Sequence, residues 1–505
     1  MSHLALFPML IPFTAAAVLL LGNQAVGLQR GVALFATLAG FVVSALLLVQ
    51  HVDGAPTAYA LGDWPAPYGI LFVVDRLAAE MLVLLFLLAV PALLMATSGT
   101  DVEGRHFHPL FQLQLAGLAG AFLTGDLFNL FVFFEILLLA SYTLLVHGNG
   151  ARRSSAGLLY VVLNLVGSAL FLVALALLYG ALGTLNMADI ARLLPDVPAA
   201  DVPLVRAGFA ILIAVFLLKS ALLPMALWLP HVYSAASMPV AALFAILTKV
   251  GVVALLRLTV GIFGDAPAVE GLLLPWLPLL ALGTTAFGVV ALFAATRLQV
   301  AAASLVLISS GILLFALAFA LPASTAALLF YMPHSTLATG GMLMLSGLVA
   351  QRRGPLEDRL VRGPCVGNRM LIGGAYAVFA VAIAGLPPLS GFIGKLMLMQ
   401  VGAPAEWRLV WWAALLLSGF AVTLVLVRVA ALLFWQPDDP LPDLVTGGPA
   451  RAAILLLAAA GPVIVLFAAP IAAYTLSASA ELHARTPYMA AVLGDAPPTQ
   501  RERRP

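Results

Sequence analysis

Apolar stretches long enough to cross a bilayer recur along the whole chain, and they limit its possible folds more than any other feature. A membrane-crossing helix needs about 20 apolar residues, and 63% of the 505 residues are hydrophobic whereas only 9% are charged. Because every backbone polar group must be bonded within the protein in lipid, such stretches predict an all-α polytopic membrane protein. We expect fourteen transmembrane helices, at 4–22, 31–51, 70–97, 109–124, 127–147, 156–180, 205–223, 239–262, 271–294, 299–320, 324–350, 370–402, 407–434 and 450–474.

The arginines predict the orientation of these helices. An even number of crossings places both termini on one side, and cytoplasmic loops carry the excess of basic residues. One set of alternate loops contains most arginines: Arg30, Arg105, Arg152, Arg153, Arg297, Arg352, Arg353, Arg359, Arg362, Arg369 and Arg451. The opposite set contains chiefly Arg192, Arg206 and Arg408. We therefore expect periplasmic or extracellular termini and a location in the cytoplasmic membrane of a bacterium.

The two ends of the chain carry separate expectations. The N-terminal segment MSHLALFPMLIPFTAAAVLLLG lacks the basic start and the small-residue cleavage site of a signal peptide, so we expect a retained first helix. The tail 475–505 is rich in proline and charge, a composition typical of disorder.

The chain contains only three lysines, and each lies inside an apolar stretch: Lys219, Lys249 and Lys395. A guanidinium stays charged in proteins, whereas a buried ammonium can lose its proton. A genome that replaces lysine by arginine explains the arginine-rich loops, but it does not explain three lysines at the most costly positions. We interpret these three as titratable cations.

The seventh and twelfth predicted helices are interrupted by proline. In LLKSALLPMALWLP, Lys219 precedes Pro224, and in AIAGLPPLSGFIGKLML, Pro387 and Pro388 precede Lys395. Proline breaks a helix, and broken helices at membrane depth occur where they line a cavity or lie within protein. Paired interruptions in the two halves of a transporter are typical of inverted repeats with a site near the midplane.

Other ionisable side chains divide into two groups. Glu135 lies in GDLFNLFVFFEILLLASY, where a lone carboxylate is so costly that it must be paired or protonated. His334 follows Pro333 in the eleventh helix, and beside three lysines and a glutamate its imidazole favours a proton relay over simple packing. We expect the rest at interfaces or in loops: Asp75, Glu80, His106, His108, His147 and His231. For Asp75 and Glu80, which open the third predicted helix, a role in a proton path is the alternative.

Absent motifs narrow the function. The sequence contains no phosphate loop, no dinucleotide fingerprint, no HExxH and no Cys/His cluster, so we expect no ATP-driven pump, no cofactor and no metal site. A net charge of +2 argues against nucleic acid, and the single Cys365 excludes an intramolecular disulfide. Ion or proton translocation is the direct interpretation of a row of ionisable groups in a membrane.

Three segments carry a family resemblance: GDLFNLFVFFEILLLASYTLL, LLKSALLPMALWLPHVYSAASMPVAALFAILTKVGVVALLR and AGLPPLSGFIGKLML. They resemble the antiporter-like proton-translocating subunits shared by Mrp-type cation/proton antiporters, respiratory complex I and membrane-bound hydrogenases, and the first most resembles the D subunit of the Mrp Na⁺/H⁺ antiporter. The likeness extends from about residue 70 to 435. It implies two inverted five-helix repeats, at 109–262 and 271–434, between an N-terminal part at 1–108 and a last helix at 450–474.

The resemblance also implies roles. Glu135 and Lys219 would form the charged pair of the first half-channel, Lys249 the central link, His334 the relay of the second half and Lys395 the terminal group. The sequence departs from the family pattern elsewhere: His231 replaces a common Asp, Ser237-Met238 replaces a Thr-Pro or Ser-Pro start, Ile308 replaces a Tyr before Ser309-Ser310, and Met332-Pro333 precede His334.

Three functions remain open from the sequence. The chain can be the D-type subunit of a multisubunit Na⁺ or other monovalent cation/proton antiporter. It can be an M- or N-like pump subunit of a quinone- or hydrogenase-linked complex, which uses the same residues but is driven by electron transfer in other chains. It can be a membrane scaffold, although a scaffold needs no row of titratable groups. The exchanged cation is not determined by these residues.

Overall fold

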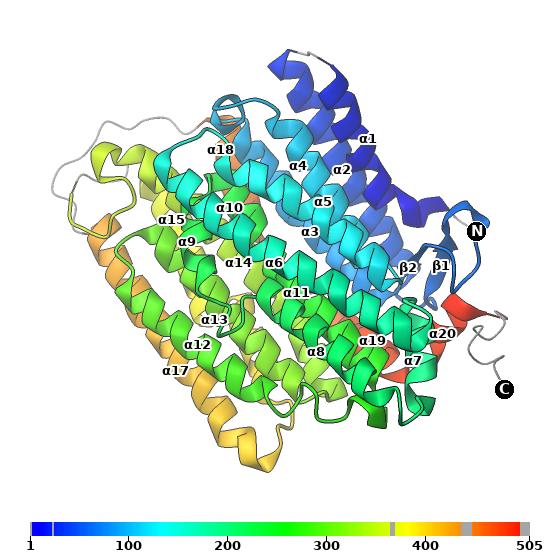
Figure 1. Cartoon of the computed structure of the whole chain (residues 1–505). Coiled ribbons are helices and arrows are strands. Elements are labelled where there is room, and N and C mark those ends of the chain that lie inside the picture. Colours follow the sequence, from blue (N-terminus) through cyan, green and yellow to red (C-terminus); the bar gives the residue numbers. More distant parts are fainter. Residues whose placement is uncertain (1–2, 23–24, 364–368, 436–446, 495–505) are drawn as a thin grey trace.

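The computed structural model describes residues 3–22, 25–363, 369–435 and 447–494, and most of them lie in helices (Figure 1). In this part of the chain, 11 helices are long and apolar enough to cross a membrane. The predicted all-α polytopic membrane fold is confirmed. Each of the fourteen predicted stretches contains helix, but the number of crossings stays a prediction because several helices are short or polar.

The elements follow in chain order, with one hairpin near the start. Two segments are π-helical, η5 (Arg257–Phe263) and η8 (Ala431–Trp435). The strands are β1 (Thr57–Ala60) and β2 (Leu71–Val74). The α-helices are α1 (Phe7–Leu21), α2 (Val26–Gln50), α3 (Arg76–Ala96), α4 (Phe107–Leu123), α5 (Leu127–Val146), α6 (Ala151–Leu182), α7 (Met187–Leu193), α8 (Val202–Lys219), α9 (Trp228–Ala235), α10 (Met238–Phe244), α11 (Leu247–Leu256), α12 (Leu277–Ala294), α13 (Leu298–Ala318), α14 (Pro322–Arg352), α15 (Arg369–Ala384), α16 (Ser390–Met399), α17 (Ala405–Ala430), α18 (Gly448–Leu466), α19 (Ala468–Ala484) and α20 (Thr486–Leu493).

Both predicted helix interruptions are present. The seventh predicted helix is divided into α8 and α9 around Pro224, and the twelfth into α15 and α16 around Pro387 and Pro388. The eighth is also divided, into α10, α11 and η5, although its interior contains no proline. The last predicted helix, 450–474, is divided at Phe467 between α18 and α19.

One end of the bundle gathers the segments near both termini. The strands β1 and β2 pair antiparallel, with Thr57 opposite Val74, and His3 Nδ1 lies 2.9 Å from the Tyr59 hydroxyl. The helix α20 packs against β1 and α7 at the same end (Figure 1). This arrangement agrees with an even number of crossings; which compartment faces this end is a separate question.

Two local predictions are wrong. Residues 71–74 form a strand rather than the start of the third helix, because Phe and Val favour extended structure and Asp75 then caps α3 by accepting a hydrogen bond from the Ala78 amide at 2.8 Å. The tail 475–505 is helical through Leu493, because α19 buries Thr475 and Ser479 against the bundle. Residues 495–505 and Cys365 lie outside the described part of the chain.

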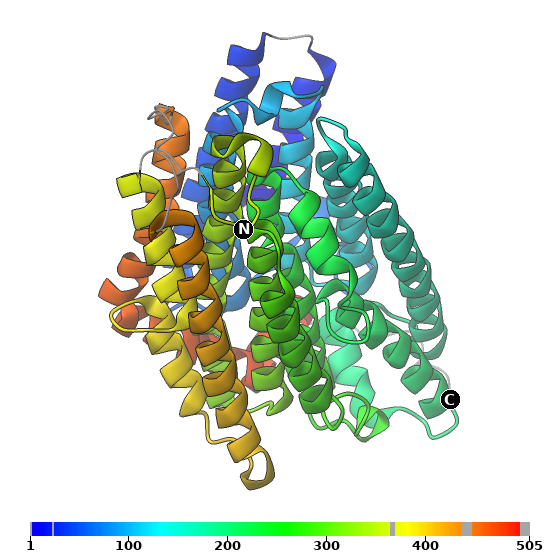
Figure 2. The same cartoon turned by 90° about the vertical axis from the view of Figure 1, so that its left-hand side faces the viewer.

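The centre of the bundle is formed by α10–η5, α13 and α14, which are almost entirely buried. The helices α1, α2, α6, α12 and α18 lie on the outside of the bundle (Figure 2). They bury one face and expose leucine, valine and phenylalanine on the other, as lipid-facing helices do. Glycines allow close packing between these layers: a Cβ on Gly117 of α4 would lie 2.7 Å from the Leu137 amide of α5. The central layer therefore holds the candidate site.

Candidate functional site

Glu135 and Lys219 each form a hydrogen bond with a polar side chain of α6. The half-buried Glu135 carboxylate on α5 accepts a short hydrogen bond from the Ser168 hydroxyl. The Lys219 Nζ, at the buried end of α8, donates to Asn164 Oδ1 at 2.9 Å and lies 5.6 Å from the centre of the Phe134 ring. The resemblance implied a charged pair, but the two groups form no direct ion pair. The side chains of α6 between them account for the separation.

The helix break after Lys219 is held by contacts from neighbouring helices. Ala221 has a left-handed backbone, with φ of 53°, which is strained for a residue with a Cβ. The free amide of Leu223 donates to the Thr284 hydroxyl of α12 at 2.9 Å. Gly251 of α11 lies against the break so closely that a Cβ there would be 2.7 Å from the Ser220 amide. The break therefore brings Lys219 next to the helix that carries Lys249.

Lys249 connects the two predicted halves. It is fully buried on α11, and its Nζ donates to the Ser309 hydroxyl of α13 at 3.0 Å. A second hydroxyl, that of Thr248, lies 3.5 Å away. The contact joins a helix of the segment 109–262 to a helix of the segment 271–434.

His334 lies on α14 against the start of α16. Its Nδ1 is 2.8 Å from the Ser390 hydroxyl, whereas its buried Nε2 has no hydrogen-bond partner among the described residues. Gly391 provides the space for this ring, since a Cβ there would lie 2.9 Å from the imidazole Cε1. One ring nitrogen is therefore left to accept or give a proton.

Lys395 reaches back across the second helix break. Its Nζ donates to the carbonyls of Ile383 at 3.2 Å and Ala384 at 2.8 Å, the last two residues of α15. Carbonyls at a helix end have no partner within the helix, and the break before Pro387 makes these two available. Gly385 has φ of 80°, and a Cβ there would lie 2.6 Å from Lys395 Cδ.

A small cavity joins the groups of the second half. It is lined by Ser309, the partner of Lys249, and by His334 and Lys395. Other hydroxyl-bearing residues also line it: Tyr331, Ser335, Thr339 and Ser418. Three of the five predicted pathway residues thus meet this cavity directly or through one hydroxyl, while Glu135 and Lys219 lie around α6. No lysine is within ion-pair distance of a carboxylate in the described chain.

Sequence reasoning missed the neutral partners of these groups. Asn164 and Ser168 are four residues apart in the apolar run YVVLNLVGSALF, and this helical spacing of two polar residues was the available signal. Ser390 lies in the predicted break, where only the glycines and prolines pointed to the interruption. These side chains can carry a hydrogen-bonded path without adding charge.

Several residues expected at interfaces are instead buried. Asp75 forms a bidentate ion pair with Arg257, an arginine that the sequence had not marked, at 2.8 and 2.9 Å. His108 lies 3.0 Å from Asp101. Glu80 is only 8% exposed. His106 and His231 are exposed as predicted. The ion pair with Arg257 explains the burial of Asp75, because a paired charge tolerates low exposure. The hydrogen bond to Asp101 satisfies one ring nitrogen of the buried His108.

The described residues contain no group of three or more His, Cys, Asp or Glu side chains able to hold a metal ion. The candidate site is instead a row of single ionisable groups joined by hydroxyls, an amide and helix-end carbonyls. Such a row can pass protons between neighbours and can respond to a nearby charge.

Comparisons with known proteins find relatives over most of the chain. A family described as "NADH:quinone oxidoreductase/Mrp antiporter, TM" matches residues 124–423, which include all five predicted pathway residues. The chain is 40% identical over 472 residues to the D subunit of a probable K⁺/H⁺ antiporter of Rhizobium meliloti, covering 86% of this chain and 87% of that relative. It is 33% identical to the D subunit of the Na⁺/H⁺ antiporter of Bacillus subtilis, covering 88% and 89%.

Solved structures share the fold. A chain of the Mrp complex from Dietzia sp. superposes with a TM-score of 0.88 and 25% identity, covering 97% of this chain and 99% of that one. A chain of respiratory complex I from Thermus thermophilus, at 24% identity, superposes with a TM-score of 0.79, covering 97% and 100%. The chain therefore belongs to the NADH:quinone oxidoreductase/Mrp antiporter family and, within it, to the D subunits of Mrp-type antiporters.

Proposed function

We propose that this chain is the proton-translocating D subunit of a multisubunit monovalent cation/proton antiporter. The observation that carries the proposal is the buried row from Glu135 to Lys395, in which each ionisable group contacts a neutral side chain or a free carbonyl rather than a fixed countercharge. Family membership and the antiporter names of the relatives support the same function. Those names include both K⁺ and Na⁺, so the proposal specifies a monovalent cation of this class.

In this mechanism, the neutral partners of the row allow charges to move. Lys219 can release a proton toward Lys249 when Glu135 is neutral, and it can hold the proton when Glu135 is charged, because opposite charges favour each other's ionised form. Ser309 links Lys249 to the cavity that contains His334 and Lys395. A change of charge at one end thereby alters proton affinity along the row.

The two predicted repeats, 109–262 and 271–434, would act as half-channels within this mechanism. The fourth predicted helix of each repeat is broken, and a lysine lies beside each break, Lys219 at the end of α8 and Lys395 within α16. Lys249 stands between the halves through its contact with α13. We propose these boundaries as functional units.

Neighbouring subunits would complete the pathway at both ends. Glu135 and Lys395 are half-buried, whereas Lys219, Lys249 and His334 are buried. A row that ends in two partly exposed groups needs another protein surface to continue at membrane depth, because lipid cannot supply a charge partner.

We place the complex in the bacterial cytoplasmic membrane, with arginine-rich loops in the cytoplasm.

The experiment uses Lys249 in the complete complex, expressed in cells that lack other antiporters. In everted vesicles, Lys249→Ala and Lys249→Arg should both abolish proton movement driven by added Na⁺ or K⁺, because neither side chain can exchange a proton. Ser346→Ala is the control, since this buried hydroxyl bonds only to the Leu343 carbonyl of its own helix at 2.7 Å in the described chain. Normal antiport by Lys249→Arg would refute proton transfer through Lys249. Proton movement that needs NADH but no added cation would favour the redox-driven alternative.

A further inference from the structure

Glu80 differs from every other buried carboxyl in the described chain. The buried Asp75, Asp101, Asp189, Asp358 and Glu481 each form an ion pair with an arginine. Glu80 forms none, and neither of its carboxyl oxygens has a hydrogen-bond partner among the described residues. Its neighbours on α3, Ala79, Met81 and Leu82, are apolar and fully buried. Because an unpaired carboxylate at such a place is very costly, Glu80 must carry a proton at rest.

A polar route leads from Glu80 to the end of the bundle that gathers both termini. Tyr474 belongs to α19, which packs against α3, and its hydroxyl donates to the carbonyl of Arg76, four residues before Glu80, at 2.8 Å. The Arg76 side chain also forms an ion pair with Glu481. Arg76 lies one helical turn before Glu80 on α3, which is about 6 Å along the helix axis. These contacts lie at the start of α3.

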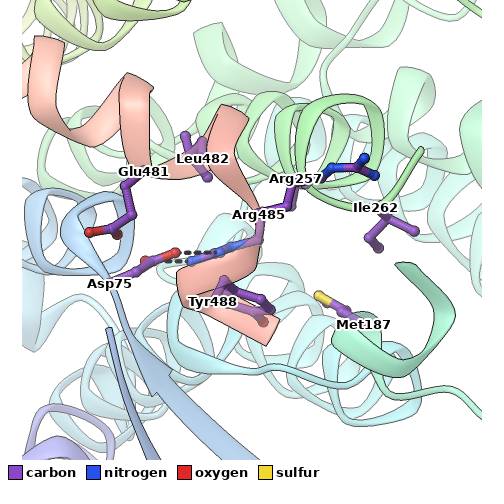
Figure 3. A pocket seen from close by; sticks show the side chains of 9 residues that line it. Asp75, Met187, Arg257, Ile262, Glu481, Leu482, Arg485 and Tyr488 are labelled. Carbon is purple, nitrogen blue, oxygen red and sulfur yellow. Dashed lines mark hydrogen bonds and ion pairs between the residues drawn. The ribbon is translucent and has the colours of Figure 1, made fainter. Parts of the chain in front are cut away.

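The route ends in a small cavity lined by Asp75, Arg257, Glu481 and Tyr488 among others. Figure 3 shows the Glu481 carboxylate near Asp75, whose own carboxylate faces Arg257, with Tyr488 next to this pair. Carboxylates at a cavity wall can exchange protons with water. Glu481 and Tyr474 belong to α19, beyond residue 423 where the family match ends. α19 therefore supplies this route from outside the segment 124–423 that matches the family model.

The titratable groups on the helices around α3 do not replace this route. On α2 and α4, Arg30 and His108 contact Asp101 at the opposite end of α3, and α10 has no titratable residue. On α14, His334 contacts Ser390, Tyr331 lines the same cavity as His334, and Arg352 lies in the last turn. On α19, His483 Nε2 lies 3.1 Å from the Thr325 hydroxyl, and the only titratable residue of α18 is Arg451 in its first turn. The groups that face the Glu80 region are thus Asp75, Arg76, Arg257, Tyr474, Glu481 and Tyr488.

We propose that Glu80 is a proton-binding site, separate from the lysine row, that exchanges its proton with the surface near the termini through Tyr474 and the Asp75/Glu481 cluster. The proposal goes beyond the proposed function, since it assigns a second proton site to the N-terminal helices and to α19. Its chemistry is that of a neutral carboxylic acid in an apolar setting, which can release its proton only when a charged route opens beside it.

The first test is chemical and does not require transport. Dicyclohexylcarbodiimide reacts with protonated carboxyls in apolar surroundings, so it should label Glu80 in the complete complex in native membranes, as read by peptide mass spectrometry. The adduct should decrease at high pH and should persist in Lys249→Ala, which disables the lysine row. Absence of the adduct across the pH range in wild type would overturn the proposal, whatever the fate of the proposed function.

The second test separates proton binding from packing. Glu80→Gln keeps the shape and neutrality of the protonated acid, so loss of cation-driven proton movement in the assembled complex would support proton binding, and normal transport would show a packing role. Glu80→Asp should retain the adduct and part of the transport. The matched control is Gln114→Leu, which removes a fully buried side chain that also has no hydrogen-bond partner in the described chain but cannot titrate. This variant should transport normally.

Discussion

Asn164 and Ser168 lie one turn apart on α6, and they hold Lys219 and Glu135 respectively. The ammonium and the carboxylate therefore interact across one helix face rather than by direct contact. A direct buried pair would fix both charges, whereas this spacing leaves each group a neutral partner when the other changes its protonation. The geometry suits a pair that must open and close its coupling during transport.

The role of Asn164 can be tested by substitution. Asn164→Leu removes the only hydrogen-bond acceptor that the described residues offer to the Lys219 Nζ, and leaving a buried charged donor unsatisfied costs about 1–3 kcal/mol or more. We expect the neutral form of Lys219 to dominate and antiport to be lost, while the complex still assembles. Asn149→Ala, in the exposed turn before α6, is the control. Normal antiport by Asn164→Leu would exclude this contact from the pathway.

Glu135 and Lys219 themselves give the second prediction. Glu135→Gln and Lys219→Ala should each eliminate transport measured with a pH-sensitive dye, and Glu135→Asp should retain part of it. Since the two groups are not in direct contact, each single change should destabilise the complex by less than the roughly 3–5 kcal/mol typical of breaking a buried pair. The double variant should be inactive and no less stable than either single variant. Near-normal transport by Glu135→Gln would contradict the mechanism.

Much of this site followed from the sequence because its signals are local. A lysine or glutamate in an apolar stretch is visible without knowledge of the fold, and prolines marked the breaks beside Lys219 and Lys395. The roles of these five residues remain predictions, but the burial of Lys219, Lys249 and His334 and the two interruptions match the structure. Glu135 and Lys395 are half-buried.

The remaining features depend on contacts between distant segments. The Asp75–Arg257 pair joins residues 182 positions apart, and the two members look like interfacial charges when each is considered alone. The helicity of α19 arises from burial against α14 and α3, which composition could not reveal for a polar tail. Likewise, nothing local distinguishes Glu80, which has no partner in the described chain, from Asp75, which has one.

Asp101 predicts a pH dependence of stability at the end opposite the termini. Burial would raise the pKa of Asp101, but hydrogen bonds from Arg30 and His108 outweigh it and hold the pKa below its ordinary value of 3.8. A lowered carboxyl pKa stabilises the folded state above the ordinary value and ceases to do so as the pH falls through the lowered one. Asp101→Asn should therefore lower the melting temperature at neutral pH, and the difference from wild type should shrink below pH 3.8. Asp53 is exposed, so Asp53→Asn should have no such effect. An equal loss of melting temperature in both variants would contradict the role of the contacts of Asp101 with Arg30 and His108.

Orientation is tested by reporter fusions at the two ends of the bundle. A reporter fused after Arg353 lies among the arginine-rich loops, where Arg297 pairs with Asp358, and one fused near Asp196 lies next to α7 at the end that gathers the termini. By the distribution of basic residues, the first should be active only as a cytoplasmic reporter and the second only as an exported one. Opposite results at both sites would reverse the proposed orientation.

Gly385 and Lys395 provide the most specific prediction, because α15, the helix that ends just before Gly385, also contains a matched control glycine. Gly385 has a left-handed backbone and lies against the Lys395 stem, so Gly385→Ala must add strain of about 1–2 kcal/mol and displace the side chain from the carbonyls of Ile383 and Ala384. Gly374, on α15, has no described atom within 4 Å of the point where a Cβ would lie, and alanine there should only favour the helix. In everted vesicles we expect Gly385→Ala to lose most cation-driven proton movement and Gly374→Ala to keep it, with both complexes assembled.

Lys395→Arg should fail for a related reason, because a rigid and permanently charged guanidinium can neither follow the bent path past Gly385 nor release a proton. Full transport by Gly385→Ala would show that the position of Lys395 at the helix break is not required for the final proton transfer.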